Sequence, residues 1–481
     1  MGLKKNILYS GFLTTSLYVF QFITYPYVAR VLGVTNIGIC NFVQSIVQYF
    51  SLFSMLGISV LGVREIAKCN GDKDKLNQTF SRLFILNASF TVLVLVLYIV
   101  AIELVPQLSQ YRHLLYIGAS QLIFGTFAVE WLFRGLEEFK YITLRTLFVR
   151  TTYVVSVFLL VRDADDYVTY FVIYSGMIIA NGMINWSYGM RFVRFSFQSI
   201  AGIGQYVKPM IFLGSQLILT SLYTTFNIVY LGITCGDTQV GYYTTATKIE
   251  NIILALYTSF TLVMMPRISA LMESDDTDGI KRMITQSFNL LFAFVFPCIF
   301  FAEFYAEELV YLVAGAGYEG AVLPMRLVMP LMLVVGLEQI LIVQILMPAR
   351  ADKQVFINSI LGASCSILLN LLIVSKLQSI GSALVWFSSE LAVMLTAFYF
   401  VRRRYSDLRI VKNVVKHLMA FMPLLLAYYC ISMFNHPLWT KFIEGAILTL
   451  LYSHLVLFCV IKNSTYIMSI RFLVTNKFVH K

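Results

Sequence analysis

The sequence predicts an all-α, polytopic membrane protein of about fourteen transmembrane helices, built as two six-helix lobes in parallel repeat plus two extra C-terminal helices. Composition points to a membrane, because 59% of the 481 residues are hydrophobic and only 13% are charged. Soluble domains carry about a quarter charged residues. Mean hydropathy is +0.77. The apolar runs and an internal repeat predict how many helices there are and how they are grouped.

Apolar runs of a length suited to crossing about 30 Å of hydrocarbon recur along the whole chain. They fall at 7–29, 40–63, 83–104, 114–133, 146–161, 167–190, 209–233, 241–265, 284–302, 322–347, 355–375, 380–401, 414–434 and 442–461. The first run contains Gln21 and Pro26 and lacks a small-residue cleavage site, so we expect a span there and not a cleaved signal peptide. An even number of spans places both termini on one side of the membrane.

The basic residues set the orientation, because cytoplasmic loops of membrane proteins are enriched in Lys and Arg. With both termini in the cytoplasm, 28 of the 36 Lys and Arg residues lie on that side, among them the run 402–404. Six lie on the outer side, and Arg150 and Lys248 lie within spans. The net charge of +11 therefore reflects loops that meet anionic lipid headgroups, and we expect no nucleic-acid partner.

An internal repeat relates the two halves of the chain. A shift of 203 residues places LGVTNIG (32–38) on CGDTQVG (235–241), and Arg64 on Arg267. The shift covers six spans, an even number, so both copies have the same orientation and are related by an axis along the membrane normal. We therefore expect lobes at 1–204 and 205–412, with 413–481 forming two appended helices and a cytoplasmic tail.

The first span of each lobe is rich in polar residues. Span 7–29 contains Gln21, and span 209–233 contains Gln216 and Asn227. Hydroxyl and amide groups that face lipid lose their water partners, so we expect these spans to line a cavity between the lobes. The alternative is that single polar side chains join neighbouring helices through hydrogen bonds.

Several segments resemble the Wzx-type polysaccharide flippases of the multidrug/oligosaccharidyl-lipid/polysaccharide exporter superfamily. They are YPYVARVLGVTNIG from Tyr25, the segment 42–68, EWLFRGLEEFKYI (130–142) and the segment 241–269. The resemblance covers about residues 1–410. It implies a transporter with two six-helix lobes and alternating access in the bacterial inner membrane. It also implies an undecaprenyl-pyrophosphate-linked oligosaccharide as substrate, moved for O-antigen, capsule or exopolysaccharide assembly, and the polymerase and chain-length machinery as partners.

Such a substrate has an anionic head, so the candidate binding residues are cations in or near the spans. Arg30 lies one turn beyond Pro26 at the outer end of the first span. We expect it either to contact phosphate or to extend to the membrane–water interface. Lys248 lies two turns into the eighth span. We expect Lys248 to contact the diphosphate, the alternative being a pair with a carboxylate on another helix.

Three further arginines lie at the cytoplasmic ends of spans. Arg134 follows Glu130 by four residues, which favours an intrahelical ion pair, or else places Arg134 at the cytoplasmic mouth of the cavity. Arg64 and its repeat partner Arg267 end the second and eighth spans. They anchor the helix ends, or they form a ring that receives the diphosphate, since arginine binds phosphate with two parallel hydrogen bonds.

Three glutamates within spans are candidates for coupling transport to protons or sodium: Glu250, Glu338 and Glu390. Carboxylates inside a membrane are costly and point to function unless they are paired. No ATP-binding loop, zinc-type cluster or Ser-His-Asp arrangement is discernible, so we expect no cofactor, no metal site and no enzymatic activity.

Two other functions stay open. A cation-coupled drug exporter of the same superfamily would have acidic groups around its cavity, and the three glutamates keep that interpretation alive, although the spans contain no aspartate. A membrane polysaccharide polymerase would need a sizeable outer loop, whereas the longest expected outer segment, 303–321, is short and largely apolar. The sugar, the coupling ion and the oligomeric state do not follow from the sequence.

Overall fold

The structure, a computed structural model, describes residues 3–69, 71–197, 201–274, 276–404, 410–434 and 436–460. Every regular element within these ranges is a helix, which confirms the predicted all-α class. The chain packs as two compact units. The first contains Met1–Thr244, Ala314–Gly317 and Gly362–Trp386, and the second contains Thr245–Val313, Tyr318–Leu361 and Phe387–Lys481. The lobe boundaries expected from the repeat stay a prediction.

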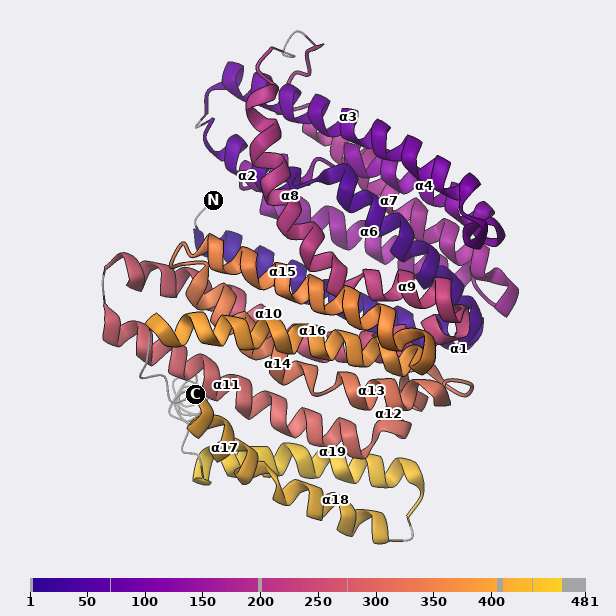
Figure 1. Ribbon diagram of the computed structural model, residues 1–481, viewed down its shortest axis with the longest axis vertical. Helices are drawn as coiled ribbons and strands as arrows, with labels where there is room; N and C mark the ends of the chain where they lie inside the picture. The colour runs from indigo at the N-terminus through magenta and orange to yellow at the C-terminus, as the bar shows by residue number, and fades with distance from the viewer. Residues whose placement is uncertain are drawn as a thin grey trace, which may run out of the picture. The chain divides into compact units, whose positions relative to one another are not determined.

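Nine helices begin the chain within the first unit. They are α1 (Leu3–Met55), α2 (Ile58–Ala67), α3 (Lys73–Leu104), α4 (Arg112–Phe127), α5 (Glu130–Gly135), α6 (Phe139–Leu160), α7 (Tyr167–Gly189), α8 (Gly204–Thr224) and α9 (Phe226–Cys235). Helix α1 packs against α3, α4 and α6, and α7 packs against both α4 and α6 (Figure 1). The span expected at 146–161 is therefore longer than predicted, because α6 begins seven residues earlier, at Phe139.

An aromatic cluster fills one part of the first unit. The rings of Phe84 and Trp186 have centroids 4.6 Å apart and are tilted by 40°, and the Phe80 ring centroid lies 5.5 Å from that of Trp131. A Cβ atom on Gly62 would lie 2.7 Å from the Trp131 ring, so only glycine lets α2 approach α5 this closely. Because lipid chains are as apolar as these side chains, such close packing holds the helices together more than removal from water does.

The repeat is visible in the backbone of the first unit. Gly33 bends α1 with φ 74° and ψ 170°, and its repeat partner Gly236 ends α9 with φ 85° and ψ 177°. Both conformations are open to glycine and strained for other residues. Just beyond these glycines, the hydroxyl groups of Thr35 and Thr238 lie 3.0 Å apart. These two threonines are also separated by 203 residues, so the sequence repeat corresponds to a local structural pairing.

The second unit is built around a long helix, α11 (Thr277–Phe304). Its other helices are α12 (Ala306–Ala314), α13 (Val322–Val328), α14 (Leu331–Glu338), α17 (Ile410–Phe421), α18 (Pro423–Met433) and α19 (Leu438–Leu455), with π-helices at η5 (Gln339–Leu346) and η7 (Val456–Val460). The helices expected to be appended, α17, α18 and α19, pack against α11 (Figure 1).

Three long helices carry residues of both units: α10 (Asp237–Glu273), α15 (Asp352–Leu369) with the π-helix η6 (Asn370–Val374), and α16 (Ser375–Arg404). In the described ranges ten helical segments are long and apolar enough to cross a membrane, or eleven if α8 and α9, bent by 43°, form one span. Two of these segments, Val19–Ala67 and Asp352–Arg403, have 49 and 52 residues, which is enough for two crossings each. The chain is a multi-pass membrane protein, and the count of fourteen spans stays a prediction.

Candidate functional site

The sequence-predicted cations lie in different surroundings. Arg30 is exposed on α1, and its aliphatic carbons pack over the backbone of Gly315. Arg64 is exposed in the last turn of α2, a position suited to an interfacial anchor. Lys248 is half-buried on α10, one residue from the buried Ile249. Their roles toward a substrate stay predictions.

The three polar residues predicted to line the cavity from the first span of each lobe differ in burial. Gln21 on α1 and Gln216 on α8 are partly exposed. Asn227 on α9 is fully buried, and its side-chain oxygen accepts hydrogen bonds from the Asn370 amide at 2.6 Å and from the Ser366 hydroxyl at 3.3 Å. In this conformation Asn227 joins α9 to α15 and η6, close to the bend between α8 and α9. This is the helix-joining alternative that the sequence left open.

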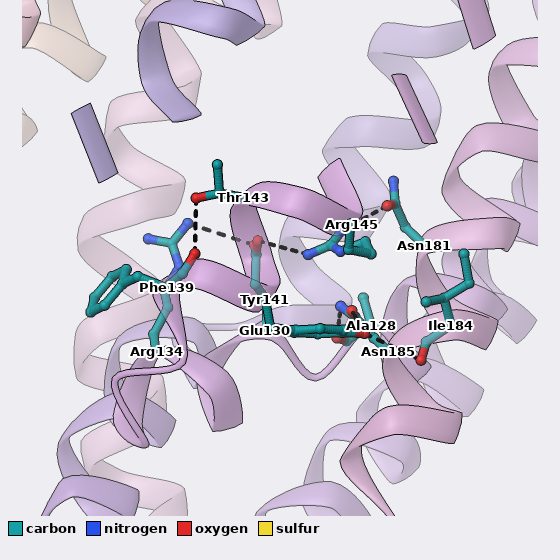
Figure 2. Close-up of polar contacts among 10 residues, drawn as sticks. All are labelled: Ala128, Glu130, Arg134, Phe139, Tyr141, Thr143, Arg145, Asn181, Ile184 and Asn185. Carbon is teal, nitrogen blue, oxygen red and sulfur yellow. Dashed lines mark hydrogen bonds and ion pairs between the residues drawn. The ribbon is translucent and has the colours of Figure 1, made fainter. Parts of the chain in front are cut away.

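A polar network lies where α4, α5, α6 and α7 meet (Figure 2). The Glu130 carboxylate lies 3.6 Å from the Arg134 guanidinium, which confirms the expected intrahelical pair. The same carboxylate lies 3.3 Å from Arg145, whose side chain is only 7% exposed. Arg145 also donates a hydrogen bond of 2.6 Å to the side-chain oxygen of Asn181 on α7. Arg145 is buried and Arg134 is exposed, so Arg145 depends more on Glu130 to offset its charge.

The backbone at this junction is held by a second set of contacts. Val129 has a left-handed conformation, with φ 34°, and separates α4 from α5. The carbonyl of Ala128 beside it accepts a hydrogen bond from the Asn185 amide, whose oxygen accepts one from the Tyr141 hydroxyl at 3.0 Å. These bonds satisfy groups that the break in the helix leaves without helical partners. Figure 2 shows both sets of contacts in one small region.

Sequence reasoning missed Arg145. The apolar run at 146–161 placed it just outside the span, among the cytoplasmic cations. The helix begins at Phe139, which moves Arg145 nearly two turns into α6. Its i to i+4 partner would be Val149, so no local spacing rule could have paired it with Glu130, 15 residues earlier.

The three glutamates predicted for ion coupling come together in the second unit. They lie on α10, at the end of α14 and on α16, at Glu250, Glu338 and Glu390. Glu250 is 0% exposed and Glu390 is 5% exposed. The Glu338 and Glu390 carboxyl groups lie near each other, and Glu390 also lies near enough to Glu250 for their charges to interact. Two neighbouring carboxyl groups can form a hydrogen bond only when one of them holds a proton.

Part of this carboxyl cluster has unmet hydrogen-bonding capacity. Both side-chain oxygens of Glu250 and one of Glu338 are buried without a hydrogen-bond partner among the described residues. Three ionised carboxylates so placed would repel each other and lack solvation. A π-helix starts directly after Glu338, and such irregular turns often mark functional positions. The cluster can therefore accept protons, whereas no group of three or more His, Cys, Asp or Glu side chains among the described residues is arranged to hold a metal ion.

Comparison with known proteins agrees with this architecture. A family profile described as "Polysaccharide biosynthesis protein" matches residues 3–272. The "Putative O-antigen transporter" of Escherichia coli (strain K12) is 25% identical over 410 residues, covering 84% of this chain and 97% of that protein.

Solved structures show the same fold. The lipid II flippase MurJ in an inward closed conformation has a TM-score of 0.77 at 14% identity, covering 95% of this chain and all of that chain. An inward-facing multidrug transporter of the MATE family has a TM-score of 0.64 at 13% identity, covering 83% of this chain and 99% of that chain. Both of those proteins are transporters, and the Escherichia coli relative is also named as one. Because the family profile covers more than half of its length, the chain belongs to the family of polysaccharide biosynthesis proteins.

Proposed function

We propose that this chain is a flippase that carries undecaprenyl-pyrophosphate-linked oligosaccharide across the bacterial inner membrane by alternating access. Two observations together carry the proposal. The chain belongs to the family of polysaccharide biosynthesis proteins, and its fold is similar to that of a lipid II flippase. Sugars and a diphosphate cannot cross hydrocarbon unaided, and a helical bundle with polar groups inside can lower that barrier. The product would serve O-antigen, capsule or exopolysaccharide assembly, as the name of the Escherichia coli relative suggests.

The carboxyl cluster of Glu250, Glu338 and Glu390 supports coupling to a proton or sodium gradient. Uptake of a proton or a small cation would offset the repulsion among three buried carboxyl groups. The three glutamates lie on separate helices, so binding and release can favour two different packings of those helices. Ion binding and release would thereby couple the energy of the gradient to movement of the helices that carry the three glutamates.

Complementation tests the proposal. A strain that lacks its own flippase and makes no surface polysaccharide is given this chain, and surface polysaccharide is measured on gels. The chain should restore it, whereas Glu390→Gln and Glu250→Gln should lower it, although glutamine keeps the size of the side chain. Glu273→Gln, an exposed position at the end of the same helix as Glu250, is the matched control and should keep full activity. Failure of the wild-type chain in strains with several different polysaccharides would contradict the flippase proposal.

A second candidate is a cation-coupled drug exporter. The similarity to the multidrug transporter fold and the cluster of three buried glutamates favour it. The two functions differ in one measurement, the resistance of drug-sensitive cells to cationic dyes. A flippase should leave that resistance unchanged when expressed, and an exporter should raise it in a manner that Glu250→Gln abolishes.

A further inference from the structure

Arg150 lies on the face of α6 that turns away from the exposed apolar side of this helix. The exposed side carries Leu144, Phe148, Val155 and Leu159, which are the side chains expected to meet lipid. At 100° per residue, Arg150 points to the opposite side, in a row with the buried residues Thr146 and Val157. Arg150 itself is partly exposed. The exposed part of the Arg150 side chain therefore does not lie on the lipid-facing side of α6.

Two tyrosines lie near Arg150, and a third contacts one of them. Tyr153 lies almost one turn further along α6, and Tyr170 and Tyr174 lie one turn apart on α7, which packs against α6. The rings of Tyr153 and Tyr174 are 6.1 Å apart and nearly perpendicular. The Tyr153 hydroxyl donates a hydrogen bond of 3.5 Å to the Tyr170 hydroxyl, and Arg150 lies near both Tyr153 and Tyr174. All three tyrosines lie deep among neighbouring side chains, yet each keeps part of its surface accessible.

Arg150 forms no ion pair with a carboxylate in the part of the chain that the structure describes. Arg145, five residues earlier on the same helix, instead has both Glu130 and Asn181. A guanidinium group inside a span is costly unless an anion offsets its charge. An arginine that serves only structure would be expected to have such a partner within the protein, as Arg145 does. The difference between these two neighbours indicates that the anion for Arg150 comes from a ligand.

We propose that Arg150, Tyr153, Tyr170 and Tyr174 form a subsite that binds one acidic sugar of the lipid-linked cargo. A guanidinium group binds a single carboxylate through two parallel hydrogen bonds, so one arginine matches one uronate-type sugar. A diphosphate carries more negative charge than one guanidinium offsets. Tyrosine rings offer flat apolar faces to a pyranose ring, and their hydroxyl groups can pair with sugar hydroxyls. The inference rests on the proposed flippase function and adds a selectivity for charged oligosaccharides.

Three synthetic probes test the subsite with the full-length protein in lipid nanodiscs. The first is a farnesyl-diphosphate-linked disaccharide that ends in glucuronic acid, the second is the same compound ending in glucose, and the third is farnesyl diphosphate alone. Binding is measured by calorimetry. The wild-type protein should bind all three and prefer the glucuronic acid probe. Arg150→Gln should weaken the binding of that probe by on the order of 10- to 100-fold and leave the other two unchanged.

Two further variants separate the roles within the subsite. Arg150→Lys keeps the charge but loses the paired hydrogen bonds, so it should retain part of the preference for the acidic sugar. Tyr174→Leu should weaken binding of both sugar probes and not of farnesyl diphosphate, because it removes a stacking ring. Arg194→Gln, a substitution of an exposed arginine elsewhere in the first unit, is the matched control and should change nothing.

The outcomes distinguish the subsite from the flippase proposal. If Arg150→Gln weakens all three probes alike, the group binds diphosphate or only supports the fold, and the subsite is wrong. Unchanged binding of the glucuronic acid probe by that variant overturns it as well. If Arg150→Gln does not fold, Arg150→Lys decides, because a reduced preference supports the subsite and full retention opposes it. If the wild-type protein binds none of the probes, the flippase proposal fails together with the subsite.

Discussion

The ion pairs of Glu130 provide a quantitative test of the polar network between α5 and α6. Glu130 pairs with two arginines of different burial, because the Arg145 side chain is 7% exposed and the Arg134 side chain is 53% exposed. Glu130 itself is 40% exposed, so water screens part of both interactions. We expect a double-mutant cycle between Glu130→Gln and Arg145→Gln to give a coupling energy of about 1.5 kcal/mol, the lower end for a hydrogen bond to a charged group.

The exposed pair should be much weaker. Exposed helical pairs at i and i+4 contribute about 0.3–0.5 kcal/mol, so the cycle between Glu130→Gln and Arg134→Gln should give a coupling energy in that range. The free energies of unfolding are measured by titrating SDS into mixed micelles while following tryptophan fluorescence, to which the adjacent, buried Trp131 contributes. Equal coupling energies for the two arginines would refute the argument that burial decides the strength of these pairs.

Three further predictions follow from the backbone, the buried amides and the charge distribution. Gly33→Ala and Gly236→Ala should each lower the free energy of unfolding by about 1–3 kcal/mol, because both positions need a backbone conformation that strains other residues; equal stability to the wild type would contradict this. Asn370→Leu should cost about 1–3 kcal/mol in the same assay, since it leaves the buried Asn227 oxygen with fewer donors, and a neutral effect would argue against this bond. A cysteine that replaces Arg403 in a cysteine-free background should not react with an impermeant reagent in intact cells, and labelling from outside would reverse the predicted orientation.

The sequence predicted the helices well because a membrane imposes a simple rule on composition. Segments that cross hydrocarbon must be apolar and helical over most of their length, so apolar runs predict their positions. The boundaries were less accurate where polar residues lie inside a helix. Arg145 and the polar residues around it made the run at 146–161 look short, although α6 extends from Phe139 to Leu160. Arg145 and its polar neighbours were enough to shift the apparent boundary by two turns.

The repeat was predictable for a different reason. Gly33 and Gly236 share an unusual backbone conformation, which restricts both positions to glycine and so keeps the match visible at a separation of 203 residues. Surface positions carry no such restriction, and they matched only in scattered places.

The contents of the candidate site were only partly predictable. Each of the three glutamates proposed for ion coupling could be found as an acid within an apolar run. Their meeting in one cluster could not, because α10, α14 and α16 are brought together by tertiary packing that no local spacing describes. Arg150 was recognised as a charge inside a span. Its neighbours Tyr170 and Tyr174 lie on another helix, so the tyrosine-lined group also became visible only in the fold.

Transport by the purified chain tests the central claim most directly. Proteoliposomes contain the protein and an undecaprenyl-pyrophosphate-linked oligosaccharide that carries a fluorescent label on its sugar. An impermeant reductant added outside quenches only the label in the outer leaflet. With a proton or sodium gradient, the wild-type chain should make label from the inner leaflet accessible, so that quenching exceeds that of protein-free liposomes. Glu390→Gln should reduce this excess. Quenching by the wild-type chain that equals that of protein-free liposomes under both gradients would contradict the account.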